Sequence, residues 1–444
     1  MTRRNRKRVS LPADPVRTTI ESLSHDGRGV THVEGKAVFV DGALPGEEVD
    51  FLYTALSRRH DEGKVVEVLR ASVDRVQPKC AHFGVCGGCS LQHMDPEAQI
   101  QAKQQVLLDN LRHIGKVEAG EILAPLTGPH WGYRNKARLG VKHVRKKGKV
   151  LVGFRERNKP YLAELERCEV LHPSVGERLV ELAELIASLQ TFERIAQIEV
   201  AVGEEATALV FRNLDPLGAE DTARLTAYAQ RTGLHLWLQP AGPSSAAPLW
   251  PQESRLFYTL PAHELVLDFL PTDFTQVNPQ INRAMIDHAL ALLEPRDHER
   301  ILDLFCGLGN FSLPIARRAA AVVGVEGDAG LVQRARDNAM RNGIDNCEFH
   351  AADLTQDPSG LPWMRQSYDK LFIDPPRSGA AEMMPWVARL KPQRIVYVSC
   401  HPASLARDAG LLVHKQGYRL LQAGVMDMFP HTAHVESIAV FSRT

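Results

Sequence analysis

The sequence has no net charge, no long apolar run and few cysteines. Its 53 basic and 53 acidic residues cancel, so nucleic-acid binding would have to come from local patches and not from a global field. No apolar stretch approaches membrane-spanning length, and none follows the basic first residues as in a secretory signal. We therefore expect a cytoplasmic protein with no membrane partner. Seven cysteines in 444 residues fit a reducing compartment, where thiols serve metals or catalysis more often than disulfides.

Composition and local patterns divide the chain into a tail and three domains. The length allows two or three domains, and 44% of the residues are hydrophobic, as folded cores require. Residues 1–11 form a basic tail, which suits a solvated terminus as well as an RNA contact. Over residues 12–71, short β-type segments between turn clusters predict a small OB-like β-barrel, which could bind nucleic acid or dock proteins. Residues 72–270 predict a central α+β domain, and residues 271–444 alternate strand and helix, as in a doubly wound α/β fold.

The central region carries a strongly basic stretch. Positions 134 to 159 hold eleven Lys or Arg residues and one acid, Glu156. Such a block is usually a solvated surface, but Trp131, Tyr133 and Phe154 interleave with these cations. Aromatic planes beside phosphate-binding cations suit unstacked RNA bases. The stretch therefore favours an RNA-binding surface.

A glycine turn after the first strand of the last domain predicts a cofactor site. Residues 303–310 read DLFCGLGN, with Gly307 and Gly309 at a strand-to-helix turn. The turn has neither the third glycine of a dinucleotide fold nor the Gly-Lys-Ser/Thr of a phosphate loop. The next two strands end in Glu326 and Asp353. These three strand ends resemble those of class I S-adenosylmethionine-dependent methyltransferases, in which the first acid holds the ribose and the second residue lies by the adenine.

Two further strand ends offer a nucleophile and a base. C5 of uracil is a poor nucleophile, so its methylation requires a thiolate to add at C6 and a base to remove the C5 proton afterwards. Cys400 stands at a strand end in the segment SCHP, and Glu436 comes just before the last strand. Asp374, in the segment DPPR, follows the fourth strand, where the target base would lie. All three residues should meet at one edge of the sheet.

Together these motifs closely resemble the RNA uracil-C5 methyltransferase family, over nearly the whole chain. The resemblance implies that Cys400 is the nucleophile, that Glu436 is the general base, and that Asp374 lies between the cofactor and the uracil. It further implies an S-adenosylmethionine pocket formed by Gln276, Phe305, Asn310, Glu326, Asp353 and Asp374. One departure is His401, which follows the nucleophile where the family leads us to expect Asn.

A cysteine cluster predicts a metal site. Cys80, Cys86 and Cys89 fall within ten residues, and Cys168 is the other cysteine of the central region. Four sulfur ligands suit zinc or a [4Fe-4S] cluster, and the spacing does not decide between them. The rRNA members of the family carry such a pattern with an iron–sulfur cluster, so the resemblance implies a [4Fe-4S] cluster held by all four cysteines, with a structural role. It also identifies the predicted N-terminal barrel as TRAM-like and the last domain as Rossmann-like.

The domain combination favours one substrate class over its alternatives. The barrel, the four cysteines and the catalytic domain together resemble the enzymes that methylate a uridine of 23S rRNA; the same chemistry on another rRNA uridine or on tRNA is the alternative. DNA cytosine methylation uses a similar thiolate but prefers Pro-Cys, whereas this chain has Ser399-Cys400. A non-enzymatic RNA-binding protein would have lost Cys400, Glu436 or the glycine turn. We expect a monomer acting on a single-stranded or loop uridine of 23S rRNA, because the base must be unstacked to reach Cys400.

Overall fold

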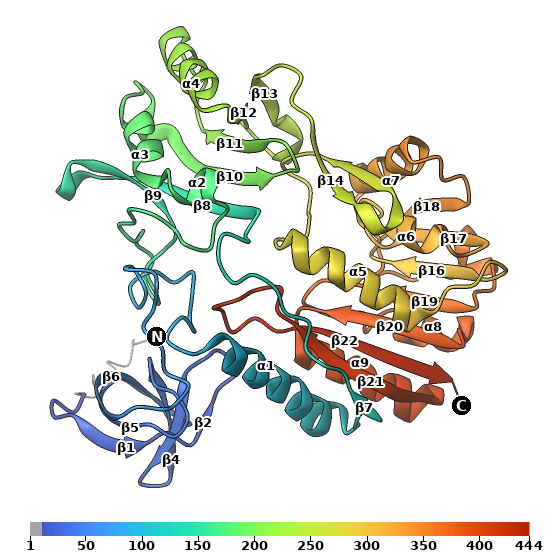
Figure 1. The fold of residues 1–444 in the computed structure, drawn as a ribbon, viewed down its shortest axis with the longest axis horizontal. Helices are drawn as coiled ribbons and strands as arrows, with labels where there is room; N and C mark the ends of the chain where they lie inside the picture. Colours follow the sequence, from blue (N-terminus) through green and yellow to red (C-terminus); the bar gives the residue numbers. More distant parts are fainter. Residues whose placement is uncertain (1–10, 444) are drawn as a thin grey trace, which may run out of the picture. The chain divides into compact units, whose positions relative to one another are not determined.

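The computed structural model describes residues 11–443 (Figure 1), so the predicted basic tail lies outside the described residues except for Leu11. The chain forms two compact units. One comprises the described residues up to Lys103 together with His431–His434, and the other comprises Gln104–Pro430 and the residues from Val435 onward. Within residues 11–443, no helix is both long enough and apolar enough to cross a membrane.

The first unit contains a six-stranded β-barrel with the strand order β1-β5-β6-β4-β3-β2. The segment that forms β1 and β2 pairs with β5 through its first half and with β3 through its second half, which closes the sheet. Ile20, Val38, Val40 and Phe51 fill the interior. This is the small barrel that the sequence predicts. The strands are β1 Val16–Thr19, β2 Ser22–Leu23, β3 Gly29–Val33, β4 Lys36–Asp41, β5 Glu48–Leu56 and β6 Asp61–Arg70.

The second unit begins with a mixed six-stranded sheet in the order β13-β12-β11-β10-β8-β9. The basic stretch forms the hairpin of β8 and β9. Along β8 buried residues alternate with accessible ones, as on a sheet with one covered face, whereas β9 is buried after its first residue, Lys149. Several of its cations pair with acids, for example Arg138 with Glu199 at 2.7 Å. The strands are β8 Lys136–Val144, β9 Lys149–Gly153, β10 Ile195–Val202, β11 Thr207–Asn213, β12 His235–Leu238 and β13 Ala247–Trp250, and the helices are α2 Pro173–Gly176, α3 Leu179–Ala187 and α4 Ala219–Thr232.

The second unit also contains an eight-stranded sheet in the order β18-β17-β16-β19-β20-β22-β21-β7 (Figure 1). Five strands from β18 to β20 run parallel, as alternating strands and helices predict. β22 pairs antiparallel with β20, and β21 pairs antiparallel with β22. The strands are β16 Arg300–Leu304, β17 Ala321–Glu326, β18 Cys347–Ala351, β19 Lys370–Ile373, β20 Arg394–Ser399, β21 Tyr418–Met426, β22 Glu436–Arg443 and β7 Glu121–Ile122.

Helices flank this sheet, and the hairpin of β14 (Leu256–Leu260) and β15 (Leu265–Phe269) precedes it. The apolar sides of the helices and strands share one core that includes Met285, Phe311 and Val396. These helices are α5 Pro279–Leu293, α6 Ser312–Ala316, α7 Ala329–Arg341, α8 Met384–Leu390 and α9 Pro402–Gln416, and a further helix, α1 Pro96–Asn110, begins in the first unit and ends in the second. Because five neighbouring strands are parallel, the turns after them meet at one edge, and the predicted site residues lie there.

Candidate active site

The turn after β16 presents main chain at this edge. Phe305, Gly307 and Gly309 have positive φ angles of 65°, 54° and 96°. Glycine adopts such angles without strain, which explains the two glycines. Phe305 is held there by its backbone N–H, which donates to the Val325 carbonyl at 2.8 Å. The predicted glycine turn is therefore shaped for close approach of a ligand.

Two carboxylates flank the turn. Glu326, the last residue of β17, accepts hydrogen bonds from the backbone N–H groups of Gly307 at 3.1 Å and Asp328 at 3.0 Å. Asp303 is fully buried, and its Oδ2 accepts from the Ser312 hydroxyl at 2.5 Å. Its Oδ1 has no hydrogen-bond partner. Burial raises the pKa of Asp303 to about 8, and the charges of Asp374 and Glu326 add to this effect.

Asn310 is locked by two partners from outside the glycine turn. Its Oδ1 accepts from the Tyr258 hydroxyl at 2.8 Å and from Nδ2 of Asn282 at 3.0 Å. Its Nδ2 donates to Oδ1 of Asn282 at 2.9 Å. Tyr258 lies on β14 and Asn282 on α5. These contacts fix the orientation of the Asn310 amide from both sides.

Gln276 and Asp374, predicted from distant parts of the chain, meet at the site. Gln276 Nε2 donates to Asp374 Oδ2 at 3.4 Å. The Asp374 backbone N–H donates to the carbonyl of Leu304, the last residue of β16, at 3.3 Å. Burial raises the pKa of Asp374 to about 7. This carboxyl group therefore changes from its neutral to its ionised form near neutral pH.

Cys400 and Glu436 meet across two antiparallel strands. Ser399 of β20 is the register partner of Ser437 of β22. One residue further, Cys400 therefore lies opposite Glu436, and directly opposed side chains of a ladder share one face of the sheet. The sequence prediction that a thiol and a carboxyl group meet beyond the strand ends agrees with this register.

The surroundings of Cys400 and Glu436 favour their neutral forms. Burial raises the pKa of the Cys400 thiol to about 11; Glu436 and Asp374 add to the shift, while Arg377 opposes it. Glu436 is only 3% exposed. Burial, followed by the nearby charge of Asp374, raises its pKa well above the ordinary value. A carboxylate whose pKa is raised is a stronger proton acceptor than an exposed one.

Asp353 stands apart from this tightly packed group. It is exposed, and its carboxylate accepts from the hydroxyl of Thr355 at 2.7 Å and from the backbone N–H of the same residue at 2.9 Å. These bonds lower the pKa of Asp353. It follows β18 at the expected strand end, with a side chain accessible to a ligand.

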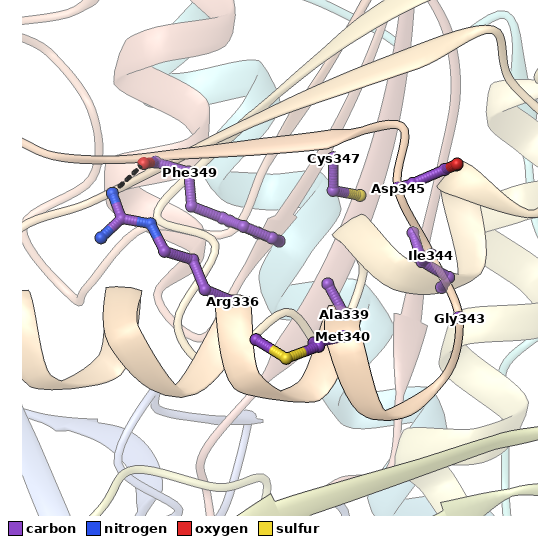
Figure 2. Close-up of a pocket in the computed structure, with 8 residues that line it drawn as sticks. All are labelled: Arg336, Ala339, Met340, Gly343, Ile344, Asp345, Cys347 and Phe349. Atoms are coloured by element: carbon purple, nitrogen blue, oxygen red, sulfur yellow. Dashed lines mark hydrogen bonds between the residues drawn. The ribbon is translucent and has the colours of Figure 1, made fainter.

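A surface pocket of about 430 Å³ lies elsewhere on the same sheet (Figure 2). It is formed by the end of α7, the following loop and the first part of β18, and its lining includes Met340, Asp345 and Cys347. Cys347 begins β18, whereas the site residues follow the carboxyl ends of the strands. Burial raises the pKa of the Cys347 thiol to about 12. The pocket is therefore separate from the candidate active site, and its raised pKa keeps the Cys347 thiol protonated at neutral pH.

Within residues 11–443, the four predicted cysteine ligands are not grouped as the ligands of a metal centre would be. Cys80, Cys86 and Cys89 lie in a segment of turns and isolated bridges, and the Gly88 backbone N–H donates to Cys86 Sγ at 3.4 Å. Cys168 donates its backbone N–H to the Gly176 carbonyl at 2.8 Å. Across residues 11–443, no three His, Cys, Asp or Glu side chains are grouped as metal ligands would be. The iron–sulfur assignment stays a prediction.

Three residues at the site were not among the sequence predictions. Tyr258 and Asn282 hold Asn310. Phe274 is 66% exposed, two positions before Gln276. Its exposure near Gln276 becomes apparent only in the structure, because nothing in the local sequence shows that this ring is exposed.

Comparison with known proteins shows the family of this chain. Residues 257–444 match the family model described as tRNA (Uracil-5-)-methyltransferase, and residues 15–56 match the TRAM domain. The chain is 56% identical to the 23S rRNA (uracil(1939)-C(5))-methyltransferase RlmD of Alkalilimnicola ehrlichii, over 99% of each chain. It is also 56% identical to the RlmD of Methylococcus capsulatus, over 98% of this chain and 99% of that one.

The fold agrees with a solved structure as well. The tRNA (uracil-54, C5)-methyltransferase of Pyrococcus abyssi, in complex with S-adenosyl-L-homocysteine, superposes with a TM-score of 0.74 at 23% identity, covering 96% of this chain and 100% of that one. The fold is thus α/β, with an N-terminal TRAM domain and a methyltransferase domain. From the identity to the two RlmD proteins over almost their full length, we conclude that this chain belongs to the RNA (uracil-C5)-methyltransferase family.

Proposed function

We propose that this protein transfers a methyl group from S-adenosylmethionine to C5 of a uridine in 23S rRNA. The observation that carries this proposal is the placement of Cys400 opposite Glu436, with Asp374 close enough to shift the pKa of both. A thiol and a buried carboxyl group on one face match the two steps that C5 methylation requires. The names of the RlmD relatives support 23S rRNA as the substrate.

In the first step, Cys400 adds to C6 of the unstacked uracil. The Sγ–C6 bond forms, and the electron pair of the C5–C6 double bond makes C5 enolate-like and nucleophilic. With a pKa of about 11, the thiol is protonated at neutral pH in the protein alone. The thiol must therefore lose its proton to the surrounding water as the uracil binds, so that the thiolate adds to C6. When bound, S-adenosylmethionine supplies the electrophilic methyl group that C5 accepts.

In the second step, Glu436 removes the proton from C5. The electron pair of the C5–H bond restores the C5–C6 double bond, and the Sγ–C6 bond breaks with its electrons on sulfur, which releases Cys400 as a thiolate. Glu436 must be ionised at this point, and burial, which raises its pKa, makes the carboxylate a strong proton acceptor. Asp374 accepts a hydrogen bond from Gln276 and is proposed to lie between the cofactor and the uracil. We propose that Asp374 orients the uracil against Cys400.

The cofactor pocket is proposed to include Gln276, Phe305, Asn310, Glu326, Asp353 and Asp374. The residues around the glycine turn fit S-adenosylmethionine, because the turn exposes main chain and acidic groups suit the hydroxyl and ammonium groups of this molecule. Asp303 supports the fit, since its buried Oδ1 has no partner in the protein. Glu326 would hold the ribose, and Asp353 would lie by the adenine.

The four cysteines are proposed to hold a [4Fe-4S] cluster. Cys80, Cys86, Cys89 and Cys168 are not disulfide-bonded, so the donor set has the thiol chemistry that the cluster requires. The backbone N–H directed at Cys86 Sγ is a contact that cluster thiolates commonly accept. Anaerobically purified protein should contain iron and sulfide, and Cys86→Ser should lose both, while Cys347→Ser keeps them. Stoichiometric zinc in place of iron, or no metal at all, would overturn this assignment.

We further propose a role for each of three regions of the chain. Residues 12–71 form the TRAM-like barrel and contact RNA, residues 72–270 form the iron–sulfur and RNA-binding region, and residues 271–444 carry the chemistry. The TRAM match and the basic β8–β9 hairpin support RNA contact by the first two parts. We expect the enzyme to act as a monomer in the cytoplasm, where thiols stay reduced.

The deciding experiment supplies labelled S-adenosylmethionine with unmodified 23S rRNA or unmodified tRNA. We expect 5-methyluridine in the 23S rRNA, none with Cys400→Ala, and normal amounts with the control Cys347→Ser. Label in tRNA alone would move the assignment to the alternative substrate. Label in neither RNA from folded protein would overturn the enzymatic proposal.

A further inference from the structure

His401 directly follows Cys400 and immediately precedes helix α9. Its Nδ1 accepts the backbone N–H of Ser404 at 3.3 Å, which makes it the N-cap, and the same nitrogen lies 2.9 Å from the Ser404 hydroxyl. An N-cap side chain satisfies a backbone donor that the first turn of a helix otherwise leaves without a partner. The ring of His401 thus fixes the turn that carries Cys400 to the first turn of α9.

Ser404 extends this contact to the loop that carries Asp374. The Ser404 hydroxyl donates to the Arg377 carbonyl at 2.7 Å. Ser404 is only 8% exposed, so the bond is shielded from competing water. His401 and Ser404 therefore bridge the turn after β20 to the segment 374–377 after β19.

Ser399 extends the same chain to the strand that begins with Glu436. Its hydroxyl accepts the His401 backbone N–H at 3.2 Å, and its carbonyl accepts the Ser437 hydroxyl at 2.9 Å. Both serines are buried. One network of hydrogen bonds thus joins the three segments that carry Asp374, Cys400 and Glu436.

We propose that His401 is a positioning residue for the methyl-transfer reaction, which holds Cys400 in register with Asp374 through Ser404. The inference rests on the proposed function. Displacing a reacting group by about 1 Å can cost roughly 100-fold in rate, so loss of this bridge should slow the attack on C6. The effect should fall on kcat, because His401 is not among the residues assigned to bind the cofactor.

The test compares His401→Leu with His401→Asn. Leu has a similar size but no polar atom, whereas the Asn side-chain oxygen branches from the same carbon position as Nδ1 and can accept the Ser404 N–H. We expect His401→Leu to lose roughly 10- to 100-fold in kcat, with KM for both substrates within about threefold of wild type. His401→Asn should restore kcat to within about threefold, and Ser404→Ala should give part of the loss.

RNA that contains 5-fluorouridine gives a second readout. After addition and methylation, C5 carries fluorine and a methyl group and has no proton to remove, so the covalent adduct accumulates without the Glu436 step. The single-turnover rate of adduct formation should fall in His401→Leu by the same factor as kcat. His235→Ala, on β12, serves as a matched control, because it loses a similar 2.9 Å contact from Nδ1 to a serine hydroxyl, that of Ser254.

Equal kcat in His401→Leu and wild type would overturn the positioning role, as would a loss that His401→Asn shares in full. A fall in adduct formation that merely follows a lower folded fraction, measured by thermal melting, would do the same. Failure of the proposed function is distinguishable, because the wild-type protein itself would then form neither 5-methyluridine nor an adduct.

Discussion

Cys400 and Glu436 lie opposite each other, one residue beyond the last register pair of β20 and β22. The antiparallel strands place the thiol and the carboxyl group on the same face, although 36 positions separate them in the sequence. Glu436 is buried beside Asp374, which raises its pKa. The geometry separates the two proposed roles: Cys400 makes the bond to C6, and Glu436 breaks the bond from C5 to its hydrogen.

Replacing Glu436 with Gln should trap the reaction after methylation. The amide has nearly the same shape but cannot accept the C5 proton, so elimination of Cys400 stalls. We expect a covalent RNA adduct on a denaturing gel, and turnover reduced by at least roughly 100-fold. Cys400→Ala in the same background should abolish the adduct. Normal turnover without an adduct would remove Glu436 from its role.

The pH dependence of the reaction should reflect the buried carboxyl groups. The pKa of Asp374 is raised from 3.8 to about 7, so its carboxylate forms only as the pH rises through that value. Glu436 shifts in the same direction, and the Cys400 thiol also ionises more readily at higher pH. The single-turnover rate should therefore fall as the pH drops below about 7, and not near pH 4 as for exposed carboxyl groups. A flat rate from about pH 5.5 to about pH 8 would contradict this.

The sequence predicts most of the barrel and of the parallel sheet, because their strands are short apolar segments between turns. The start of β3, Gly29–Val33, is not marked by the local sequence, because Gly29 belongs to a cluster of small and polar residues that is typical of a turn. Gly29 is needed in this strand because a Cβ there would lie 2.8 Å from a methyl carbon of Ile20. Close packing in the barrel, which local sequence does not reveal, decides the assignment.

The sequence likewise predicts some residues of the candidate site and not others. Cys400, Glu326 and Asp374 follow strand ends, so their positions can be predicted from a parallel sheet. Tyr258 and Asn282 lie 52 and 28 positions before Asn310 and carry no local motif. Their role depends on how the β14–β15 hairpin and α5 pack, and only the three-dimensional structure gives that.

Tyr258→Phe should weaken the binding of S-adenosylmethionine. The change removes one hydrogen bond to Asn310 Oδ1 and keeps the ring. A hydrogen bond contributes about 1 kcal/mol, so we expect KM or Kd for the cofactor to rise roughly fivefold, with KM for RNA unchanged. Tyr368→Phe, which loses a 2.8 Å bond to the Trp363 carbonyl, is a matched control for a buried tyrosine. An equal effect of both variants would assign the change to general destabilisation.

Asp303→Asn should make the protein less sensitive to alkaline pH. Burial raises the pKa of Asp303 from 3.8 to about 8. Between these two pH values the folded protein therefore keeps a proton on Asp303 that the unfolded chain has already released. The contribution of the protonated carboxyl group to stability is present at low pH and is lost as the pH rises through this window, by about 1.4 kcal/mol per pH unit. Asn cannot titrate and can still accept from the Ser312 hydroxyl.

The measurement is the Tm of the cofactor-free protein from about pH 5 to about pH 9. Above about pH 8 the Tm of Asp303→Asn should exceed that of wild type by several degrees, and the difference should shrink as the pH falls. Asp353→Asn, at an exposed carboxylate whose pKa is lowered, should not show this gain. Parallel Tm curves for Asp303→Asn and wild type would mean that Asp303 is ionised in the folded protein.

Phe274→Ala should weaken RNA binding without affecting the cofactor. Phe274 is 66% exposed in the loop before α5, and Gln276 of the same loop donates to Asp374. An exposed aromatic ring so close to the proposed uracil site suits stacking with an unstacked base, which contributes about 1–3 kcal/mol. We expect KM for RNA to rise roughly tenfold, while Phe274→Tyr retains the wild-type value because it keeps the aromatic face. If Phe274→Ala binds RNA as wild type does, the ring makes no stacking contact with the substrate.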